Sequence, residues 1–369
     1  MSPTATSAPA ESRSTTPFHI RECSQSRIDK VDLDNPGFGD VFSDHMLSIQ
    51  YKDGQWQAPE IIPFGELSIS PANATLHYGQ TVFEGMKAFR GKDGSVRIFR
   101  MQDHLNRLND SCARMCIPPL DSENLGQALK ALLNLDRKWV PQKHGNALYI
   151  RPLVFATDAC LGVRPAQSYR LLIMTSPVGA YYDEGFNPVS LTTTKEYIRA
   201  VQGGSGFIKT ACNYGPTLLP AQEAQKNGFT QVIWLDAKEH RYIEEVGTMN
   251  IFFKIDGQLY TPPLNGSILG GITRNSVITL AEKWNIPVHQ QPIAIDEIFE
   301  ADANGELEEV FGSGTAAVIS PVGSISHEGN KIVTDEEQAG PFAKRLFNAI
   351  TGIQDSSRED SYGWMSSVD

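Results

Sequence analysis

The sequence predicts an α+β protein built from two unlike domains with a cleft between them. The chain has 369 residues, which is more than one ordinary domain core requires. Strand-like and helix-like patterns are mixed in both halves, and a segment rich in glycine and proline, residues 179–188, separates two apolar strands. We therefore expect a disordered tail over residues 1–30, a small α+β domain over 31–178, an interdomain loop over 179–188 and a larger domain over 189–369.

Two periodicities predict the elements of the first domain. Runs rich in Ile, Leu, Val and Tyr predict strands over residues 46–51, 96–99, 147–155 and 169–176. Apolar residues at helical spacing predict amphipathic helices over residues 103–115 and 124–139. The first 30 residues are small and polar and have no apolar period, which is typical of disorder.

The second domain alternates more densely between strands and helices. A hairpin is predicted around Asp256 and Gly257, because Asp-Gly is a strong turn signal between two apolar runs. The C-terminal residues 354–369 are polar, although Tyr362, Trp364 and Met365 could dock onto the body. The other predicted elements are strands 189–193, 231–235, 250–255, 258–261 and 308–311, helices 218–227, 273–284 and 293–301, and a small-residue loop 312–316.

Composition and charge exclude several classes of function. There are 32 Lys and Arg against 43 Asp and Glu, a net charge of −11, which argues against binding to nucleic acid or to an anionic membrane. No apolar run approaches the ~20 residues of a membrane span. Five scattered cysteines indicate reduced thiols, and none completes a metal site. Residues 1–17 lack a secretory apolar region, so we expect a cytoplasmic protein, with a mitochondrial location as the alternative.

Two segments carry side chains suited to cofactor chemistry. Lys209 lies in an apolar stretch, residues 206–216, where desolvation would lower the pKa of its amine and favour imine formation. The alternative is a surface lysine. Glu244 and Glu245 directly precede a strand expected to be buried, and a buried carboxylate needs a partner such as a protonated ring nitrogen. The alternative is that both glutamates lie in a solvated turn.

Two further segments have features that suit the binding of anions. Gly270 and Gly271 open a predicted helix whose first N–H groups would be free to bind a phosphate. The segment lacks the Gly-Lys-Ser/Thr ending of a P-loop, and a plain turn into a helix is the alternative. The small residues 312–316 would let backbone amides approach a phosphate or a carboxylate closely. A tight turn is the alternative there.

Six segments, in this order, resemble the branched-chain amino acid aminotransferases, which are fold type IV pyridoxal-phosphate enzymes with a D-amino-acid-aminotransferase-like fold. The resemblance covers residues 38–364, and the motif around Glu245 is its most specific part. It implies pyridoxal 5'-phosphate in the cleft between two domains. It also implies reversible transamination of L-leucine, L-isoleucine and L-valine with 2-oxoglutarate, and a homodimer. The matching segments are residues 83–89, 148–152, 213–217, 245–250, 262–266 and 311–316.

The resemblance implies a role for each candidate residue. Lys209 would bind the cofactor covalently and move the proton. Glu245 would face the pyridine nitrogen, and Tyr214 the phenolic oxygen. The phosphate would be held by Arg107, Ile272, Thr273 and Thr315. The substrate would be bound by Phe38, Tyr78, Phe83, Tyr149, Arg151, Tyr181, Thr248, Thr315 and Ala316. For Arg107 the alternative is a solvated helix face, and for each aromatic residue it is core packing.

The chain departs from the mammalian members, which carry a redox Cys-x-x-Cys motif after the Gly-Thr-Ala loop. Residues 317–320 are Ala-Val-Ile-Ser here, so that thiol switch is missing. The same fold also hosts D-amino acid transaminases, amine transaminases and aminodeoxychorismate lyases, and a non-catalytic binding protein of this fold is a third hypothesis. Arg151 and the aromatic residues favour branched-chain substrates, while Lys209, Glu245 and Tyr214 together favour an enzyme.

Overall fold

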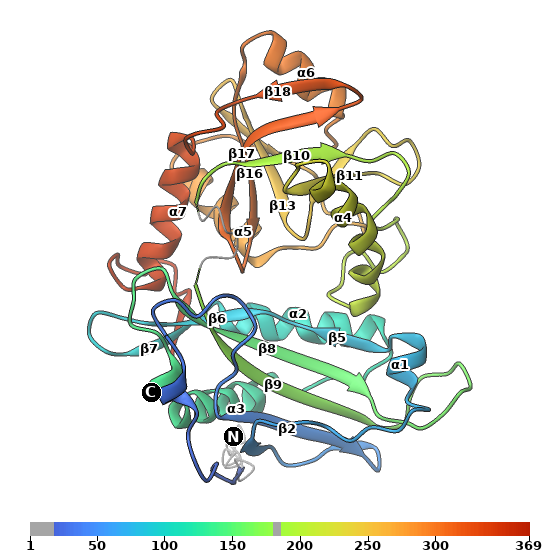
Figure 1. The fold of residues 1–369 in the computed structure, drawn as a ribbon, viewed down its shortest axis with the longest axis vertical. Helices are drawn as coiled ribbons and strands as arrows, with labels where there is room; N and C mark the ends of the chain where they lie inside the picture. Colours follow the sequence, from blue (N-terminus) through green and yellow to red (C-terminus); the bar gives the residue numbers. More distant parts are fainter. Residues whose placement is uncertain (1–17, 180–185) are drawn as a thin grey trace, which may run out of the picture.

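The computed structural model describes residues 18–179 and 186–369. Each of its two units is a β-sheet with helices packed against it, and the units meet in the middle of the molecule (Figure 1). Tyr181, expected in the substrate site, lies outside the described residues. Among the helices of the described segments, none is long and apolar enough to cross a membrane.

The first unit contains a ten-stranded sheet in the order β1-β4-β2-β9-β8-β6-β7-β19, with β3 paired to β2 and β5 to β8. The strands are β1 (His19–Ile20), β2 (His45–Lys52), β3 (Gln55–Trp56), β4 (Glu60–Pro63), β5 (Thr81–Phe83), β6 (Met86–Arg90), β7 (Val96–Phe99), β8 (Ala147–Ala156), β9 (Tyr169–Val178) and β19 (Met365–Ser367). The helices are α1 (Ala74–Tyr78), α2 (Met101–Arg114) and α3 (Ser122–Leu135), with short 3-10 helices η1 (Ile28–Lys30) and η2 (Arg137–Trp139).

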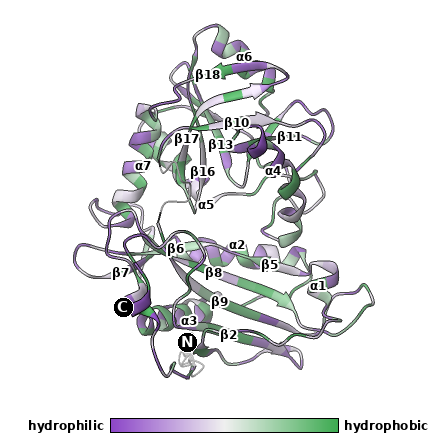
Figure 2. Ribbon diagram, in the orientation of Figure 1, coloured by the Kyte–Doolittle hydropathy of each residue, from purple (hydrophilic) through white to green (hydrophobic). Residues whose placement is uncertain are grey.

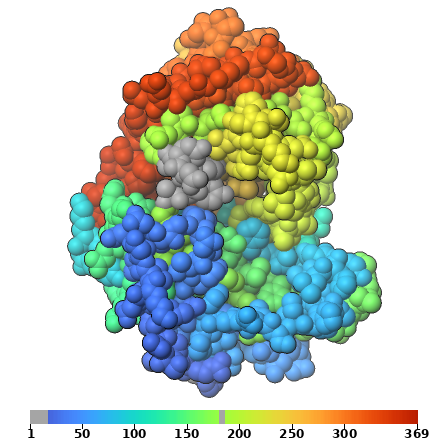
Figure 3. Space-filling view, viewed as in Figure 1, coloured from blue at the N-terminus to red at the C-terminus, as the bar shows by residue number. Residues whose placement is uncertain are grey.

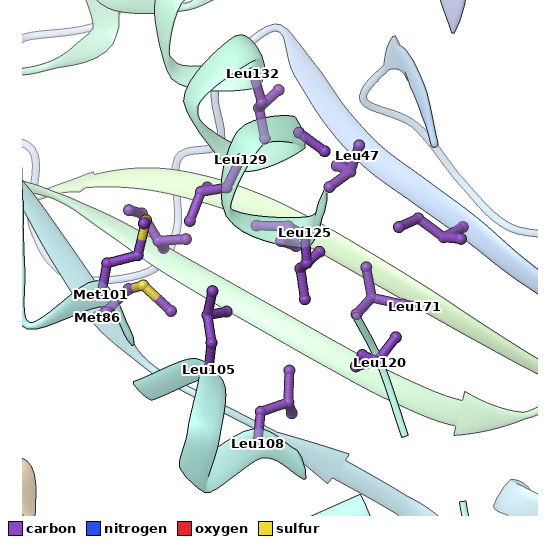
Figure 4. Close-up of a cluster of buried hydrophobic side chains, with 14 of the residues drawn as sticks. Leu47, Met86, Met101, Leu105, Leu108, Leu120, Leu125, Leu129, Leu132 and Leu171 are labelled. Atoms are coloured by element: carbon purple, nitrogen blue, oxygen red, sulfur yellow. The ribbon is translucent and has the colours of Figure 1, made fainter. Parts of the chain in front are cut away.

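The core of the first unit forms where α2 and α3 pack together on the sheet. Both helices bury a stripe of apolar side chains at helical spacing, which drives their docking. Asp121 begins α3 as an N-cap, since its carboxylate accepts hydrogen bonds from the N–H groups of Glu123 and Asn124. Figure 4 shows the side chains that meet there, among them Leu105 and Leu108 of α2, Leu125, Leu129 and Leu132 of α3, and Leu47 and Leu171 of the sheet.

The second unit contains a nine-stranded sheet in the order β12-β11-β10-β17-β16-β13-β14-β15, with β18 paired to β17. The strands are β10 (Val189–Thr193), β11 (Gln231–Leu235), β12 (Ile243–Val246), β13 (Asn250–Ile255), β14 (Gln258–Thr261), β15 (Val288–Gln290), β16 (Leu307–Gly314), β17 (Val318–His327) and β18 (Asn330–Val333). The helices are α4 (Leu218–Lys226), α5 (Ile272–Lys283), α6 (Ile295–Ala303) and α7 (Pro341–Gln354), with 3-10 helices η3 (Ala211–Asn213) and η4 (Gly215–Thr217).

One apolar cluster joins the two units. It combines Phe89, Phe99 and Trp364 of the first unit with residues of α5, α7 and the β16–β17 hairpin, including Phe311 and Val318. Helix α7 carries both apolar and polar residues (Figure 2) and turns its apolar side to this cluster. The C-terminal segment then returns to the first unit, where β19 pairs with β7 (Figure 1). The docking of Trp364 that the sequence suggested is confirmed.

Most predicted elements are confirmed, often to the residue, as for β7, β10, β11, β13 and β14. The predicted helix 124–139 ends earlier, at Leu135, because the Asp136 carboxylate binds the backbone N–H and ring Nδ1 of His45. Strand β17 and helix α7 were not predicted.

Three expectations require correction. Glu244 and Glu245 lie within strand β12 and not before a strand, and residues 312–314 continue β16 and are not loop. Residues 18–30 of the expected tail include β1, which pairs with β4, and η1, next to which Asp44 accepts hydrogen bonds from Ser26 and from the N–H of Arg27.

We predict that Trp364→Ala lowers the free energy of unfolding by about 3–5 kcal/mol, the range for truncating a buried aromatic residue. Trp364 is only 8% exposed and packs on Phe99 and Tyr362, so the variant would leave a cavity between the units. Urea unfolding measures the change. Val333→Ala is the control, since Val333 is 52% exposed. Equal stability of the two variants would contradict the assigned role of the C-terminal segment.

Candidate active site

Lys209 belongs to the second half of the chain, yet its backbone is bonded to the first unit. Its N–H donates to Ser111 Oγ of α2 at 3.0 Å, and its carbonyl accepts from Phe83 N–H of β5 at 3.0 Å. Thr210 forms a β-bridge with Val82 and donates from its hydroxyl to the carbonyl of Thr81. The segment therefore acts as a short additional strand beside β5, at the junction of the units.

The Lys209 amine faces a hydroxyl and two aromatic rings. Nζ donates to Tyr214 Oη at 2.7 Å and lies 4.6 Å from the centre of the Phe83 ring. The two side chains meet because η3 folds the chain back between them, and Asn213 stabilises that turn by donating to the carbonyls of Ser205 and Ile208. Lys209 is half-buried, so it is not the freely solvated surface lysine that the sequence left as an alternative.

Neighbouring positions on β12 point to opposite faces of the strand, and this separates the two glutamates. Glu245 lines the cavity, and its Oε1 accepts from the N–H of Leu269 at 2.7 Å. Burial raises the pKa of Glu245, and the Arg199 guanidinium, 3.3 Å away, partly offsets that effect. Glu244 accepts from Ser267 Oγ, and burial raises its pKa as well. Both carboxyl groups are buried, which rules out the solvated turn.

The start of α5 presents free backbone donors to the same cavity. Ile272 and Thr273 occupy its first turn, where N–H groups have no acceptor within the helix. Asn250 holds the approach to the helix by donating from Nδ2 to the carbonyl of Leu269 at 2.9 Å. A Cβ atom on Gly271 would lie 2.0 Å from Asn250 Oδ1, so glycine is needed there. The arrangement is a backbone anion site at a helix N-terminus.

A buried ionic cluster fixes Arg107 beside this helix start. Arg107 Nε and Nη2 donate to the two oxygens of Glu84 at 2.6 and 2.9 Å, and Nη1 donates to the Gly270 carbonyl at 3.0 Å. His104 Nδ1 lies 2.9 Å from Glu84 Oε2. Burial alone would raise the pKa of Glu84, but Arg107 and His104 outweigh it and hold that pKa well below its usual range. Arg107 is thus a fixed cation and not a solvated helix residue.

A three-residue turn of small side chains closes another side of the cavity. Thr315, Ala316 and Ala317 connect β16 to β17, and all three line the cavity. Within residues 18–179 and 186–369, no group accepts a hydrogen bond from their backbone N–H groups. Ser313 and Gly314, at the end of β16, also line the cavity. Such consecutive free amides can bind a carboxylate or a phosphate.

Aromatic residues and one arginine form the apolar wall. Phe83, Tyr149 and Arg151 line the cavity, and the Arg151 guanidinium lies 4.9 and 5.2 Å from the two ring centres. Arg151 donates to Tyr149 Oη at 3.1 Å, whereas its buried Nε has no partner among the described residues. A Cβ atom on Gly85 would lie 1.9 Å from Tyr149 Oη, so glycine leaves room for the tyrosine.

The remaining predicted site residues are placed differently. Thr248 lines the cavity, and Phe38 packs edge-on against Tyr149 with ring centres 5.6 Å apart. Tyr78 is 42% exposed, does not line the cavity and donates from its hydroxyl to the carbonyl of Leu161. Its aromatic ring therefore belongs to the surface of this chain.

These groups converge on one cavity of about 570 Å³ between the units. The surface is recessed there, between α4 and the first unit (Figure 3). The cavity brings together an amine, a buried carboxylate, a helix N-terminus with a fixed arginine, and a turn of free amides. A second cavity, of about 620 Å³, shares Ala316 and Ala317 with it but not Lys209. The residues that carry cofactor chemistry identify the first cavity as the candidate active site.

Sequence reasoning missed several residues that support this site. Glu84 and His104 hold Arg107, Arg199 lies against Glu245, and Asn250 holds the approach to α5. Each acts on a partner far away in the chain, so local patterns carry no signal for it. Glu84 lies in the segment 83–89 and Asn250 in the segment 245–250, both of which carry the resemblance, and this was the available indication.

Known proteins are similar to this chain in sequence and in fold. Residues 81–325 match the family described as amino-transferase class IV. The chain is 48% identical to branched-chain-amino-acid aminotransferase 2 of Bacillus subtilis, covering 94% of this chain and 96% of the relative. It is 45% identical to the branched-chain-amino-acid aminotransferase of Mycobacterium tuberculosis, covering 90% and 92%. The structure of the Escherichia coli branched-chain amino acid aminotransferase superposes with a TM-score of 0.73 at 30% identity, covering 87% of this chain and 99% of that one.

We predict that Glu84→Gln lowers the free energy of unfolding by about 3–5 kcal/mol at pH 7, because it leaves the buried Arg107 without its counter-ion. The pKa of Glu84 is depressed in the folded state, so its contribution is complete above the ordinary value of 4.5 and declines as the pH falls below it. Urea unfolding at several pH values measures the difference. Glu66→Gln, at an exposed position, is the control. A difference that does not shrink in acid would contradict this explanation.

Proposed function

This chain belongs to the class IV aminotransferases, in the branched-chain-amino-acid aminotransferase family, and we propose that it transfers the amino group of L-leucine, L-isoleucine or L-valine to 2-oxoglutarate. The products are the branched-chain 2-oxo acids and L-glutamate, and the reaction is reversible. The observation that carries the proposal is the convergence of Lys209, Tyr214, Glu245 and the α5 N-terminus on one cavity.

Members of this fold type use pyridoxal 5'-phosphate, and a solved relative is described with pyridoxamine 5'-phosphate. The residues of this cavity fit that group, since the first turn of α5 presents N–H groups for a phosphate and the buried carboxyl of Glu245 lines the same cavity as Lys209. When bound, the cofactor supplies an aldehyde that reacts with amines and a ring that accepts electrons from the substrate α-carbon.

Lys209 is the proposed covalent anchor of the cofactor and the group that moves the proton at the substrate α-carbon. Its position supports both roles, since the backbone is fixed on β5 and α2 while the amine faces the cavity. The Oη of Tyr214 lies 2.7 Å from Nζ and orients the amine. Its hydroxyl would donate a hydrogen bond to the phenolic oxygen of the cofactor. Glu245 would accept a hydrogen bond from the protonated ring nitrogen and so keep that nitrogen protonated.

The phosphate is assigned to Arg107, to the N–H groups of Ile272 and Thr273, and to Thr315. Arg107 has little freedom to move, because Glu84 holds two of its nitrogens and the Gly270 carbonyl the third. A helix N-terminus favours a phosphate both through its free N–H groups and through its partial positive charge. This grouping anchors the cofactor without a Gly-rich P-loop.

The substrate side chain is assigned to the aromatic wall, and its α-carboxylate to the amides of Thr315 and Ala316. Phe83, Tyr149 and Phe38 suit the aliphatic side chains of leucine, isoleucine and valine, and Thr248 lies at the same cavity. Glutamate is also a substrate of the proposed reaction, so its side chain must bind in the same pocket. The Nε of Arg151, which has no hydrogen-bond partner within residues 18–179 and 186–369, supports binding of its γ-carboxylate, since a buried donor without an acceptor is costly unless a ligand supplies one.

We also propose a homodimer and a cytoplasmic location, with a mitochondrial location as the alternative. Helix α1 and the loop between β8 and β9 lie together at one edge of the molecule (Figure 1), joined by the Tyr78–Leu161 hydrogen bond. Leu76, Leu161 and Val163 are 59, 64 and 84% exposed there, which supports a protein interface. All five cysteines are free thiols, which supports a reducing compartment.

Replacement of the proposed anchor should abolish turnover. We predict that Lys209→Ala reduces glutamate formation from leucine and 2-oxoglutarate by at least about 10²–10⁴-fold, the contribution of a positioned acid–base group. Borohydride treatment should abolish the visible absorbance band of the wild-type holoenzyme and leave the cofactor attached to the protein after denaturation. The Lys209→Ala variant and an untreated wild-type sample should both release the cofactor on denaturation. Lys226→Ala, on the exposed end of α4, should retain activity. A wild-type protein that transaminates D-alanine or an arylamine in place of leucine would overturn the substrate assignment.

The proposed dimer interface at Leu161 and Val163 can be tested by placing charged side chains in it. We predict that the double variant Leu161→Asp with Val163→Asp shifts the protein from dimer to monomer, because two carboxylates would be desolvated in the contact. Light scattering coupled to size-exclusion chromatography measures the mass. Val333→Asp, in exposed strand β18, is the matched control and should remain dimeric. A double variant that keeps the wild-type mass would remove this surface from consideration.

A further inference from the structure

Lys87 is a buried cation that reaches from the first unit to the turn between β16 and β17. It lies on β6 and is 6% exposed. Its Nζ donates to the carbonyl of Ala316 at 2.6 Å, across 229 residues of sequence. Burial lowers the pKa of Lys87 to about 8. The side chain therefore forms a direct contact between the sheet of one unit and the candidate carboxylate site of the other.

This charge has no acidic counterpart among the described residues. No Asp or Glu carboxylate within residues 18–179 and 186–369 pairs with Lys87, in contrast to Arg107 and Arg199, which pair with Glu84 and Glu245. A buried ammonium without a carboxylate is expensive to maintain. Among the described residues, the group that its Nζ contacts by a hydrogen bond is the Ala316 carbonyl, so the effect of the charge falls on that peptide group.

The turn that Lys87 contacts is strained. Gly314 and Val318 pair across the base of the three-residue turn, and Val318 adopts a φ of +64°. This is the left-handed conformation that a glycine usually occupies at the end of such a hairpin loop, and a β-branched residue rarely adopts it. Strained backbone persists only where its surroundings hold it. Here the apolar cluster holds Val318, and Lys87 holds the carbonyl two residues earlier.

The contact also orients the backbone donors of the turn. In a trans peptide the carbonyl of one residue and the N–H of the next point in opposite directions. Lys87 lines the larger cavity and not the candidate active site, whereas Ala316 and Ala317 line both. With its carbonyl bonded to Lys87 on one side, the Ala316–Ala317 peptide group directs the Ala317 N–H away from Lys87.

We propose that Lys87 is a positioning residue that holds the turn of Thr315, Ala316 and Ala317 in the form that binds the substrate α-carboxylate, with the Ala317 N–H as an additional donor. The inference rests on the proposed function, since it concerns the carboxylate of the same substrates. Lys87 acts from behind the turn and contacts neither substrate nor cofactor. Its positive charge polarises the Ala316–Ala317 peptide group and so strengthens the N–H as a donor.

The test compares ligands that have a carboxylate with a reagent that has none. In the Lys87→Met holoenzyme, the Kd of 4-methylvaleric acid, which is leucine without its amino group, should rise about 10- to 100-fold, the effect of one hydrogen bond involving a charged group. The KM values of leucine and 2-oxoglutarate should rise together, with a smaller change in kcat. The reaction of the bound cofactor with hydroxylamine, followed by absorbance, should keep its wild-type rate.

Two further variants complete the test. Lys87→Arg keeps the charge and the donors and should recover much of the affinity for 4-methylvaleric acid. Lys143→Met is the matched control, because Lys143 lines the same larger cavity but donates to Asp34 and Asn35 and not to the turn. It should bind 4-methylvaleric acid as the wild type does.

Two results would overturn the proposal. One is an unchanged Kd in Lys87→Met. The other is a parallel loss of carboxylate affinity, hydroxylamine reactivity and cofactor retention, which would mark Lys87 as a general structural residue. Failure of the proposed function is recognised separately, since the wild type itself would then produce no glutamate from leucine and 2-oxoglutarate.

Discussion

The backbone pairing between the Lys209 segment and strand β5 is the constraint on which the rest of the site depends. Phe83 N–H donates to the Lys209 carbonyl, and Lys209 N–H donates to Ser111 of α2. A residue of the second half of the chain is thus part of the first unit's hydrogen-bond network. The cavity exists only when the two units are docked, and the apolar cluster around Phe89, Phe311 and Trp364 supplies the driving force for docking.

Each buried charge around the cavity holds a different part of it in place. Glu84 fixes Arg107, Arg199 lies against Glu245, and Lys87 holds the Ala316 carbonyl. In a desolvated site such interactions are stronger than in water, and groups that are already oriented need no reorganisation when charge develops. Their desolvation opposes folding, so the apolar contacts between the units have to offset it.

Backbone amides provide the two anion sites, one at the start of α5 and one in the turn after β16. Amides suit this purpose because they carry no side-chain entropy and their direction is set by the fold. Small residues make both sites open to a ligand. Gly271 avoids a clash with Asn250, and Ala316 and Ala317 leave the turn accessible. Asn250, which itself lines the cavity, holds the first site, and Lys87 holds the second from the neighbouring cavity.

The sequence by itself determined the elements whose signals are local. Apolar periodicity located α2, α5 and most central strands, Asp256-Gly257 located the β13–β14 hairpin, and the motifs around Lys209 and Glu245 indicated the family and its cofactor. Only the tertiary structure decided which buried groups meet. Lys87 and Ala316 are 229 residues apart, and Arg107 and Gly270 are 163 apart. The same holds for the placement of Tyr78 on the surface and for the docking of residues 18–30. Local patterns cannot specify such contacts, because they arise only when sheets and helices from distant parts of the chain pack together.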